Sequence, residues 1–279
     1  MDDPRLTPAR GDIAAKYLEG KVAACRFVEG EVFEVIDAVA PLRERPALDA
    51  ALLTQALKGE RVSVYERNGE GWAWGQLNSD GYVGWLADAT LAKPKATLTH
   101  KVSVIRSFAF PGPSIKLPPT DVLVMGSALA IAGEDGVFAI THEGLFVPRM
   151  HLLPIERNEL DFAAVAERFV GTPYLWGGKT SLGIDCSGLV QISLNATGIP
   201  CPRDSDMQQD ALGHPLEAER TKLRRGDLLF WRGHVAIARD HDTIVHANAF
   251  HMSTVIESTG EAIARIKAGG SELVAIKRL

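Results

Sequence analysis

A short stretch, Asp185-Cys186-Ser187-Gly188, places a thiol where a helix is expected to begin. Asp185 is a suitable N-cap, and an apolar run starts at Leu189. Gly198 suits the left-handed residue that ends a helix, so the pattern predicts a helix over residues 186–197. Unpaired N–H groups and the helix dipole favour a thiolate at such a position. Cys186 is therefore a candidate nucleophile, although a buried cysteine with a purely structural role fits the same pattern.

A thiol nucleophile needs a base and a group that orients the base, and two histidines further along the chain could supply them. His234 opens one predicted strand and His246 lies in the next, with a polar turn over residues 239–242 between them. On an antiparallel hairpin the two imidazoles would lie side by side. We expect His234 to accept the thiol proton and His246 to hold its ring. A histidine satisfied within the core is the alternative for His246, and the nearby His251 is out of phase with the strand.

Six motifs follow one another in the C-terminal part of the chain. They are Gly171-Thr172-Pro173-Tyr174 with Trp176-Gly177-Gly178, and the stretches 185–190, 202–208, 225–230, 233–237 and 244–247. Together and in this order they resemble the NlpC/P60 family of cysteine peptidases, which act on bacterial cell-wall peptides. The resemblance implies a papain-like α+β catalytic domain with Cys186, His234 and His246 as its catalytic triad.

The same resemblance implies a substrate. NlpC/P60 enzymes typically cut the bond between D-γ-glutamate and a diamino acid in peptidoglycan stem peptides. Members with N-terminal bacterial SH3 domains resemble enzymes that take short peptides with a free L-alanine amine. The positions that match substrate-binding residues are Tyr174, Asp185, Ser187, Asp204 and Ser205, with Tyr82 as a contribution from the SH3-like part. A polar turn is the alternative reading for Asp204 and Ser205, and packing within the barrel is the alternative for Tyr82.

The residues before 156 are expected to form two small all-β domains. Strands are predicted at residues 25–27, 31–39, 61–66, 71–77 and 81–86. With Trp72, Trp74 and an Asp80-Gly81 turn, they resemble a bacterial SH3 domain. A more divergent strand-rich segment follows the linker Lys93-Pro94-Lys95. We therefore expect an SH3-like barrel within residues 1–92, a second within 93–155 and the catalytic domain over 156–279.

The catalytic domain contains four further predicted elements. Apolar positions with helical spacing predict a helix over residues 160–170, and another helix is expected at 260–267. The continuously apolar Leu228–Trp231 predicts a strand that is buried on both faces. A last strand is expected over residues 273–277.

Composition excludes several classes of function. The formal net charge is −5 over 279 residues, which disfavours binding to nucleic acid or to an anionic membrane. The start, Met1-Asp2-Asp3-Pro4-Arg5, has no secretory pattern and no apolar run is long enough to span a bilayer, so we expect a cytoplasmic protein. Cys25, Cys186 and Cys201 are expected to be free thiols. No metal-binding motif occurs, and no metal or other cofactor is predicted.

The sequence thus predicts a cysteine peptidase that hydrolyses the γ-D-glutamyl–diamino acid bond of short stem peptides, those with a free N-terminal L-Ala, during murein peptide recycling. Its partners would be peptidoglycan-derived peptides, and a monomer is assumed. Whether the diamino acid is meso-diaminopimelate or lysine stays open. One alternative is a wall-binding hydrolase that acts on polymeric murein. Another is a relative that uses the same fold for acyl transfer or amide hydrolysis on a different substrate.

Overall fold

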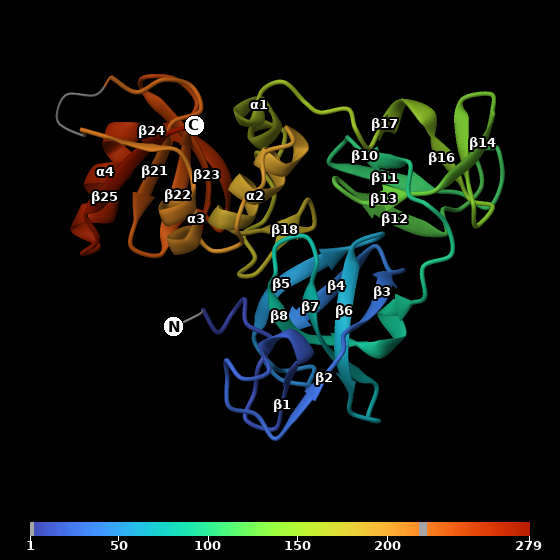
Figure 1. Cartoon of the computed structure of the whole chain (residues 1–279). Helices are drawn as coiled ribbons and strands as arrows, with labels where there is room; N and C mark the ends of the chain where they lie inside the picture. Colours follow the sequence, from blue (N-terminus) through green and yellow to red (C-terminus); the bar gives the residue numbers. More distant parts are fainter. Residues whose placement is uncertain (1–2, 218–221) are drawn as a thin grey trace. The chain divides into compact units, whose positions relative to one another are not determined.

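The computed structural model of the chain describes residues 3–217 and 222–279 (Figure 1). Contacts between residues divide the chain into two compact units, Met1–Glu156 and Arg157–Leu279. Met1 and Asp2, which belong to the acidic start of the chain, lie outside the described residues. Among the residues that are described, no helix is both long enough and apolar enough to cross a bilayer.

The first part of unit 1 is a seven-stranded antiparallel sheet in the order β5-β4-β8-β7-β6-β3-β9. Its strands are β3 (Glu31–Val35), β4 (Val39–Arg43), β5 (Leu52–Leu57), β6 (Arg61–Arg67), β7 (Trp72–Leu77), β8 (Val83–Ala87) and β9 (Leu91–Ala92). Alternate side chains such as Val35, Leu42 and Leu77 point into one core with no exposed surface. The sheet keeps two free edges, β5 and β9, so the closed barrel that we expected is not formed by strand pairing.

One strand prediction in this part was wrong in detail, and other strands were missed. The single strand expected over residues 31–39 is two strands, because the chain leaves the sheet after Val35 and re-enters it at Val39 beside a different neighbour. Strand β5 was not predicted at all. A short parallel pair, β1 (Ile13–Ala15) and β2 (Arg26–Val28), precedes the sheet, with the 3-10 turn η1 (Lys16–Leu18) between them.

The second part of unit 1 consists of three small antiparallel sheets around one core. They are β13-β10-β17 (Ala128–Leu129, His100–Val102, Leu152–Pro154), β11-β12 (Arg106–Ala109, Asp121–Val124) and β14-β15-β16 (Ile131–Asp135, Phe138–Thr141, Phe146–Pro148). The 3-10 turn η2 (Asp88–Thr90) precedes these strands in the chain, and η3 (Arg149–His151) lies between β16 and β17. Val102, Leu123 and Val147 lie at the centre of this core. That this part is a second SH3-like barrel, with its boundary after residue 92, stays a prediction.

Unit 2 combines helices with a six-stranded antiparallel sheet in the order β20-β25-β21-β22-β23-β24 (Figure 1). The strands are β20 (His214–Leu216), β21 (Leu228–Trp231), β22 (His234–Ala238), β23 (Thr243–Asn248), β24 (Ser253–Ser258) and β25 (Leu273–Arg278). The helices are α1 (Phe162–Glu167), α2 (Cys186–Ala196), α3 (Ser205–Ala211) and α4 (Thr259–Ala268), and a short hairpin of β18 (Lys179–Thr180) and β19 (Gly183–Ile184) precedes α2.

The predicted elements of this unit are found close to their expected positions. Strand β21 is interior to the sheet and wholly buried, as its apolar sequence required. The hairpin of β22 and β23 is antiparallel, with Ile237 opposite Val245. Helix α1 is shorter than expected, because Asp161 caps its start and the chain turns before Gly171. Five elements, β18, β19, α3, β20 and β24, were not predicted.

Two helices pack against the strands that carry the histidines. The apolar side chains Ala262, Ile263 and Ile266 of α4 belong to the same core as Leu229 and Ile244 of the sheet. Helix α2 packs against β22 and β23. The sheet and α2 together therefore fix the relative positions of Cys186, His234 and His246.

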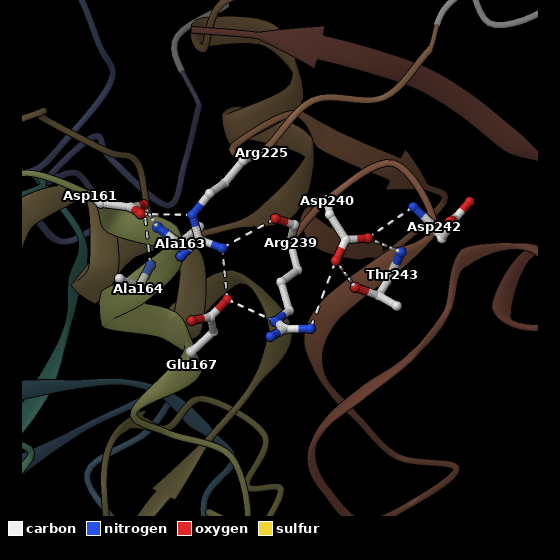
Figure 2. Close-up of polar contacts among 9 residues, drawn as sticks. All are labelled: Asp161, Ala163, Ala164, Glu167, Arg225, Arg239, Asp240, Asp242 and Thr243. Carbon is white, nitrogen blue, oxygen red and sulfur yellow. Dashed lines mark hydrogen bonds and ion pairs between the residues drawn. The ribbon is translucent and has the colours of Figure 1, made fainter.

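Helix α1 is fastened to the hairpin by ion pairs at the surface (Figure 2). Arg225 donates to Asp161 and to Glu167, each over 2.7 Å, and Arg239 donates to Glu167 over 3.0 Å. Arg225 also donates to the backbone carbonyl of Arg239, at the end of β22 (Figure 2). These side chains are partly exposed, so each pair contributes little on its own.

Candidate active site

Cys186 is the first residue of α2, as the sequence predicted. The Asp185 carboxylate accepts a hydrogen bond from the backbone N–H of Gly188 over 2.7 Å, which satisfies one of the free donors of the first turn. The helix runs to Ala196, and Gly198 follows with a φ of +79°. Cys186 itself is buried, with 7% of its surface exposed.

A buried ion pair holds the start of this helix. Arg203 donates to both oxygens of Asp185, over 3.0 and 2.7 Å, and to Oγ of Ser187 over 2.8 Å. The same carboxylate accepts from the N–H of Gly177 over 2.8 Å, and Arg203 is only 1% exposed. Asp185 and Ser187 thus lie beside Cys186 as expected, but their polar atoms bind protein groups in this structure. Their contact with a substrate stays a prediction.

Two glycines, Gly178 and Gly188, allow the loop that precedes Cys186 to lie against the first turn of α2. A Cβ atom at Gly188 would lie 2.2 Å from the carbonyl oxygen of Gly178, and one at Gly178 would lie 2.4 Å from the carbonyl oxygen of Gly183. Neither contact is possible for a larger residue without moving the backbone. The glycines of the two motifs therefore bring the loop that precedes Cys186 against the first turn of α2.

The two histidines are in direct contact. Nε2 of His234 lies 2.9 Å from Nδ1 of His246, and their ring centroids are 5.0 Å apart. The prediction that the hairpin places the imidazoles side by side is confirmed. The ring of Trp231 is close to His234 as well, with centroids 5.5 Å apart, so the His234 ring contacts both an indole and an imidazole.

Cys186 lies against the strand that begins at His234. Its sulfur has a hydrogen-bonding interaction with the backbone N–H of Val235, the residue after His234. Because His246 occupies Nε2 of His234, Nδ1 is the ring nitrogen that remains for the thiol. A thiol, an imidazole base and a second imidazole that holds the base are the parts of a nucleophilic acyl-transfer site.

Burial keeps both partners neutral in the free protein. Burial, and after it the charge of Asp185, raise the pKa of the Cys186 thiol to about 12, although the N–H groups of Val235 and Ser187 act in the opposite direction. Burial, followed by the neighbouring His246 and Arg265, lowers the pKa of His234 to about 3. The expected stabilisation of a thiolate at the helix start is therefore outweighed by the loss of water around the sulfur.

Tyr174 also lies near the thiol. Burial, and next the charge that Cys186 carries when ionised, raise the pKa of the Tyr174 hydroxyl. Its backbone pairs with Ile184 just before α2 and donates to the carbonyl of Met252 over 3.0 Å. The loop that contains Tyr174 is thereby joined both to the approach to α2 and to the start of β24.

The remaining predicted substrate residues lie in two places. Asp204 is the N-cap residue of α3 and Ser205 is its first residue, and both side chains are half-buried. Gln208 of α3 donates to the carbonyl of Ser187 over 2.9 Å, which fixes this helix beside the start of α2. Tyr82 lies in unit 1, where it is buried in the core of the seven-stranded sheet. Its part in a substrate groove stays a prediction.

Sequence reasoning missed Glu257 and gave no role to Arg203. Oε1 of Glu257 lies 2.6 Å from Nε2 of His246, on a strand that was not predicted. The run of β-branched residues Thr254-Val255-Ile256 was the available signal for that strand. Arg203 stood inside a recognised motif, but only the tertiary structure shows that its guanidinium is buried against Asp185. In the part of the chain that the structure describes, no group of three or more metal-ligating side chains is placed to hold a metal ion.

Comparison with known proteins agrees with this geometry. Residues 42–91 match the model of the bacterial dipeptidyl-peptidase SH3 domain, and residues 171–265 match the model of the NlpC/P60 family. A γ-D-glutamyl-L-lysine dipeptidyl-peptidase of Bacillus subtilis (strain 168) is 31% identical over 197 residues, which are 66% of this chain and 65% of that protein. A protein of the same name from Bacillus cereus is 26% identical over 64% of this chain and 60% of its own length. The chain thus spans less than two thirds of either relative.

A solved structure shares the fold. The crystal structure of an NlpC/P60 family protein from Bacillus cereus ATCC 10987 superposes with a TM-score of 0.74 at 21% sequence identity, over 89% of this chain and 99% of that one. The matched residues 171–265 contain the paired histidines His234 and His246, and they also contain Cys186, which interacts with the backbone of Val235. Residues 171–265 therefore form a domain that matches the NlpC/P60 family.

Proposed function

We propose that this chain is a cysteine peptidase that hydrolyses the γ-D-glutamyl–diamino acid bond of short peptidoglycan stem peptides. The observation that carries the proposal is the 2.9 Å contact of His234 with His246, beside a thiol that begins a helix. The names of the two Bacillus relatives, γ-D-glutamyl-L-lysine dipeptidyl-peptidase, support this choice of bond.

The reaction starts from a neutral thiol and a neutral imidazole. As the sulfur of Cys186 attacks the carbonyl carbon of the γ-glutamyl group, the thiol proton moves to Nδ1 of His234. The tetrahedral intermediate collapses when the C–N bond breaks and His234 gives this proton to the departing amine. Water then hydrolyses the thioester with His234 as the base. The N–H of Cys186, at the start of α2, is positioned to donate to the developing oxyanion.

Recognition of a free N-terminal L-Ala is a finer part of the proposal. An ammonium group in a closed groove needs a carboxylate opposite it, and an acetylated end would leave that carboxylate unpaired. Asp204 is a half-buried carboxylate at the start of α3, the helix that Gln208 ties to Ser187. A preference for free-amine peptides would fit murein peptide recycling in the cytoplasm.

Product analysis by mass spectrometry tests the bond and the nucleophile. The substrates are L-Ala-γ-D-Glu-L-Lys, its meso-diaminopimelate counterpart, the N-acetylated form of each, and intact sacculi. We expect release of the free diamino acid from the unblocked tripeptides by the wild type and no turnover by Cys186→Ala. Full turnover by Cys186→Ala would contradict the mechanism, and rapid solubilisation of sacculi with little tripeptide cleavage would contradict the substrate.

A pair of matched variants tests the role of Asp204. Asp204→Asn should reduce kcat/KM for the free-amine tripeptide by at least about tenfold more than for the acetylated one, because only the free amine is charged. Asp210→Asn, at an exposed position of the same helix, is the control and should change neither value. Equal losses on the two substrates would remove Asp204 from amine recognition.

A further inference from the structure

Hydrogen bonds continue from His246 away from Cys186. Nε2 of His246 lies 2.6 Å from Oε1 of Glu257 on β24, and the same oxygen accepts a hydrogen bond and ion pair from Nη2 of Arg265 on α4. The strand register places Val255 opposite His246, so Glu257 is the diagonal neighbour of His246 on the same face of the sheet. Side chains from β22, β23, β24 and α4 thus form one continuous row that ends at the base.

The row determines where the imidazole protons lie. A carboxylate can only accept a hydrogen bond, so a neutral His246 beside it carries its proton on Nε2. Nδ1 of His246 is then an acceptor, and the 2.9 Å contact requires His234 to carry its own proton on Nε2. His234 consequently offers the lone pair of Nδ1 to the thiol, which is the form that a general base needs.

Asn248 is the polar group that competes with Glu257 for Nε2 of His246. Nδ2 of Asn248 lies 3.0 Å from Nε2, and because an amide nitrogen is a donor, this contact by itself would favour a bare Nε2. The amide is oriented by His251, whose backbone N–H donates to Oδ1 of Asn248 over 2.9 Å. The contact of Nε2 with Glu257 is shorter, at 2.6 Å, and its acceptor is charged, so it outweighs the contact with Asn248 and keeps the proton on Nε2.

Glu257 is a carboxylate anion whose side chain is mostly buried. Its side chain is 14% exposed and that of His246 is fully buried. Burial raises the pKa of Glu257, but the hydrogen bonds from His246 and Arg265 outweigh it and bring the pKa down to about 2. The positive charge of Arg265 lowers the pKa of both histidines, whereas the negative charge of Glu257 raises it. The carboxylate therefore offsets the charge that His234 gains when it takes the thiol proton.

We propose that Glu257, held by Arg265, is a positioning residue that fixes the proton of His246 on Nε2 and thereby presents Nδ1 of His234 to Cys186. The consequence for turnover rests on the proposed peptidase function. The proton positions themselves do not depend on any substrate, so the two proposals can fail separately.

Nitrogen-15 NMR of the histidine rings in the full chain tests the proton positions directly, since protonated and unprotonated ring nitrogens have well-separated shifts. In the wild type we expect His246 to be protonated on Nε2 and bare on Nδ1. In Glu257→Leu this preference should be lost. A wild-type His246 that is protonated on Nδ1 would overturn the proposal, and that result needs no variant to fold.

Kinetics of matched variants test the consequence. Glu257→Leu should lower kcat for the tripeptide by about 10- to 100-fold with little change in KM, and slow the alkylation of Cys186 by iodoacetamide in parallel. Glu257→Gln keeps an acceptor oxygen and should recover most of the loss. Glu261→Leu removes an exposed carboxylate of α4 and should match the wild type. Equal kcat and alkylation rates for the Glu257→Leu and Glu261→Leu variants would refute the role. If the wild type alkylates normally but cleaves no tripeptide, the proposed function fails while alkylation still tests Glu257.

Discussion

The start of the helix at Cys186 is held by one buried carboxylate that binds backbone N–H groups and an arginine, whereas His234 is held through a row of side chains. On the nucleophile side, the Asp185 carboxylate gathers the N–H groups of Gly177 and Gly188 together with the buried guanidinium of Arg203. On the base side, side-chain contacts lead from His234 to His246 and on to Glu257. The contacts of Asp185 fix the position of the Cys186 backbone. The contacts along the histidine row fix the position of the His234 ring and also the positions of its protons.

This difference predicts different consequences of mutation. Removal of a group on the nucleophile side leaves a buried charge without its partner and should reduce stability. Removal of a group on the base side should reduce turnover more than stability, because it changes the proton positions at His234. The predictions below test that separation.

The largest effect is expected for His246→Ala. This change removes the acceptor for Nε2–H of His234, so the base can turn and change its proton position. We expect kcat for the tripeptide to fall by about 10²- to 10⁴-fold, measured by steady-state kinetics. His241→Ala, an exposed histidine in the turn of the same hairpin, is the control and should match the wild type. A loss smaller than tenfold for His246→Ala would mean that His234 is held by other groups.

Replacement of Arg203 should have the largest effect on stability. Arg203→Met leaves the Asp185 carboxylate buried without its cation, so we expect the free energy of unfolding of the catalytic unit to fall by about 3–5 kcal/mol. Urea unfolding followed by tryptophan fluorescence measures this. A change below about 1 kcal/mol would show that the backbone donors alone support Asp185.

Acid should destabilise the catalytic unit through the base side. The pKa of His234 is about 3 in the folded protein and 6.5 as the ordinary value, so the unfolded chain binds more protons between these limits. The contribution of His234 to the free energy of unfolding is therefore fully present above about pH 6.5. It declines as the pH falls toward 3, by at most about 1.4 kcal/mol per pH unit for each such histidine. Urea midpoints measured from pH 7.5 to pH 4 should show a shallower decline in His234→Asn. An unchanged slope in that variant would contradict a neutral, buried His234.

The smallest effect is expected at the exposed ion pairs of α1. Arg225→Met breaks the contacts with Asp161 and Glu167, but these side chains are partly hydrated. We expect less than about 1 kcal/mol of lost stability and no change in kcat. The same urea titration as for Arg203→Met gives a direct comparison between a buried and an exposed arginine. A loss as large as that of Arg203→Met would mean that the ion pairs drawn in Figure 2 are essential for the stability of the catalytic unit.

Local sequence signals were sufficient where a structural feature depends on neighbouring residues. The Asp185 cap and the stop at Gly198 located α2 to within a residue, and alternation located β22 and β23. The same signals failed for β5 and β24, because a strand at or near the edge of a sheet is decided by the neighbour that it pairs with.

The residue types and their order along the chain were enough to select Cys186, His234 and His246 as candidates, because these chemical groups have few substitutes. Tertiary structure alone decided that the thiol is neutral, since that depends on burial from elements distant in sequence. It also decided that Arg203 neutralises Asp185 and that Glu257 faces His246, because the pairing of strands and the packing of helices bring these charges within hydrogen-bonding distance.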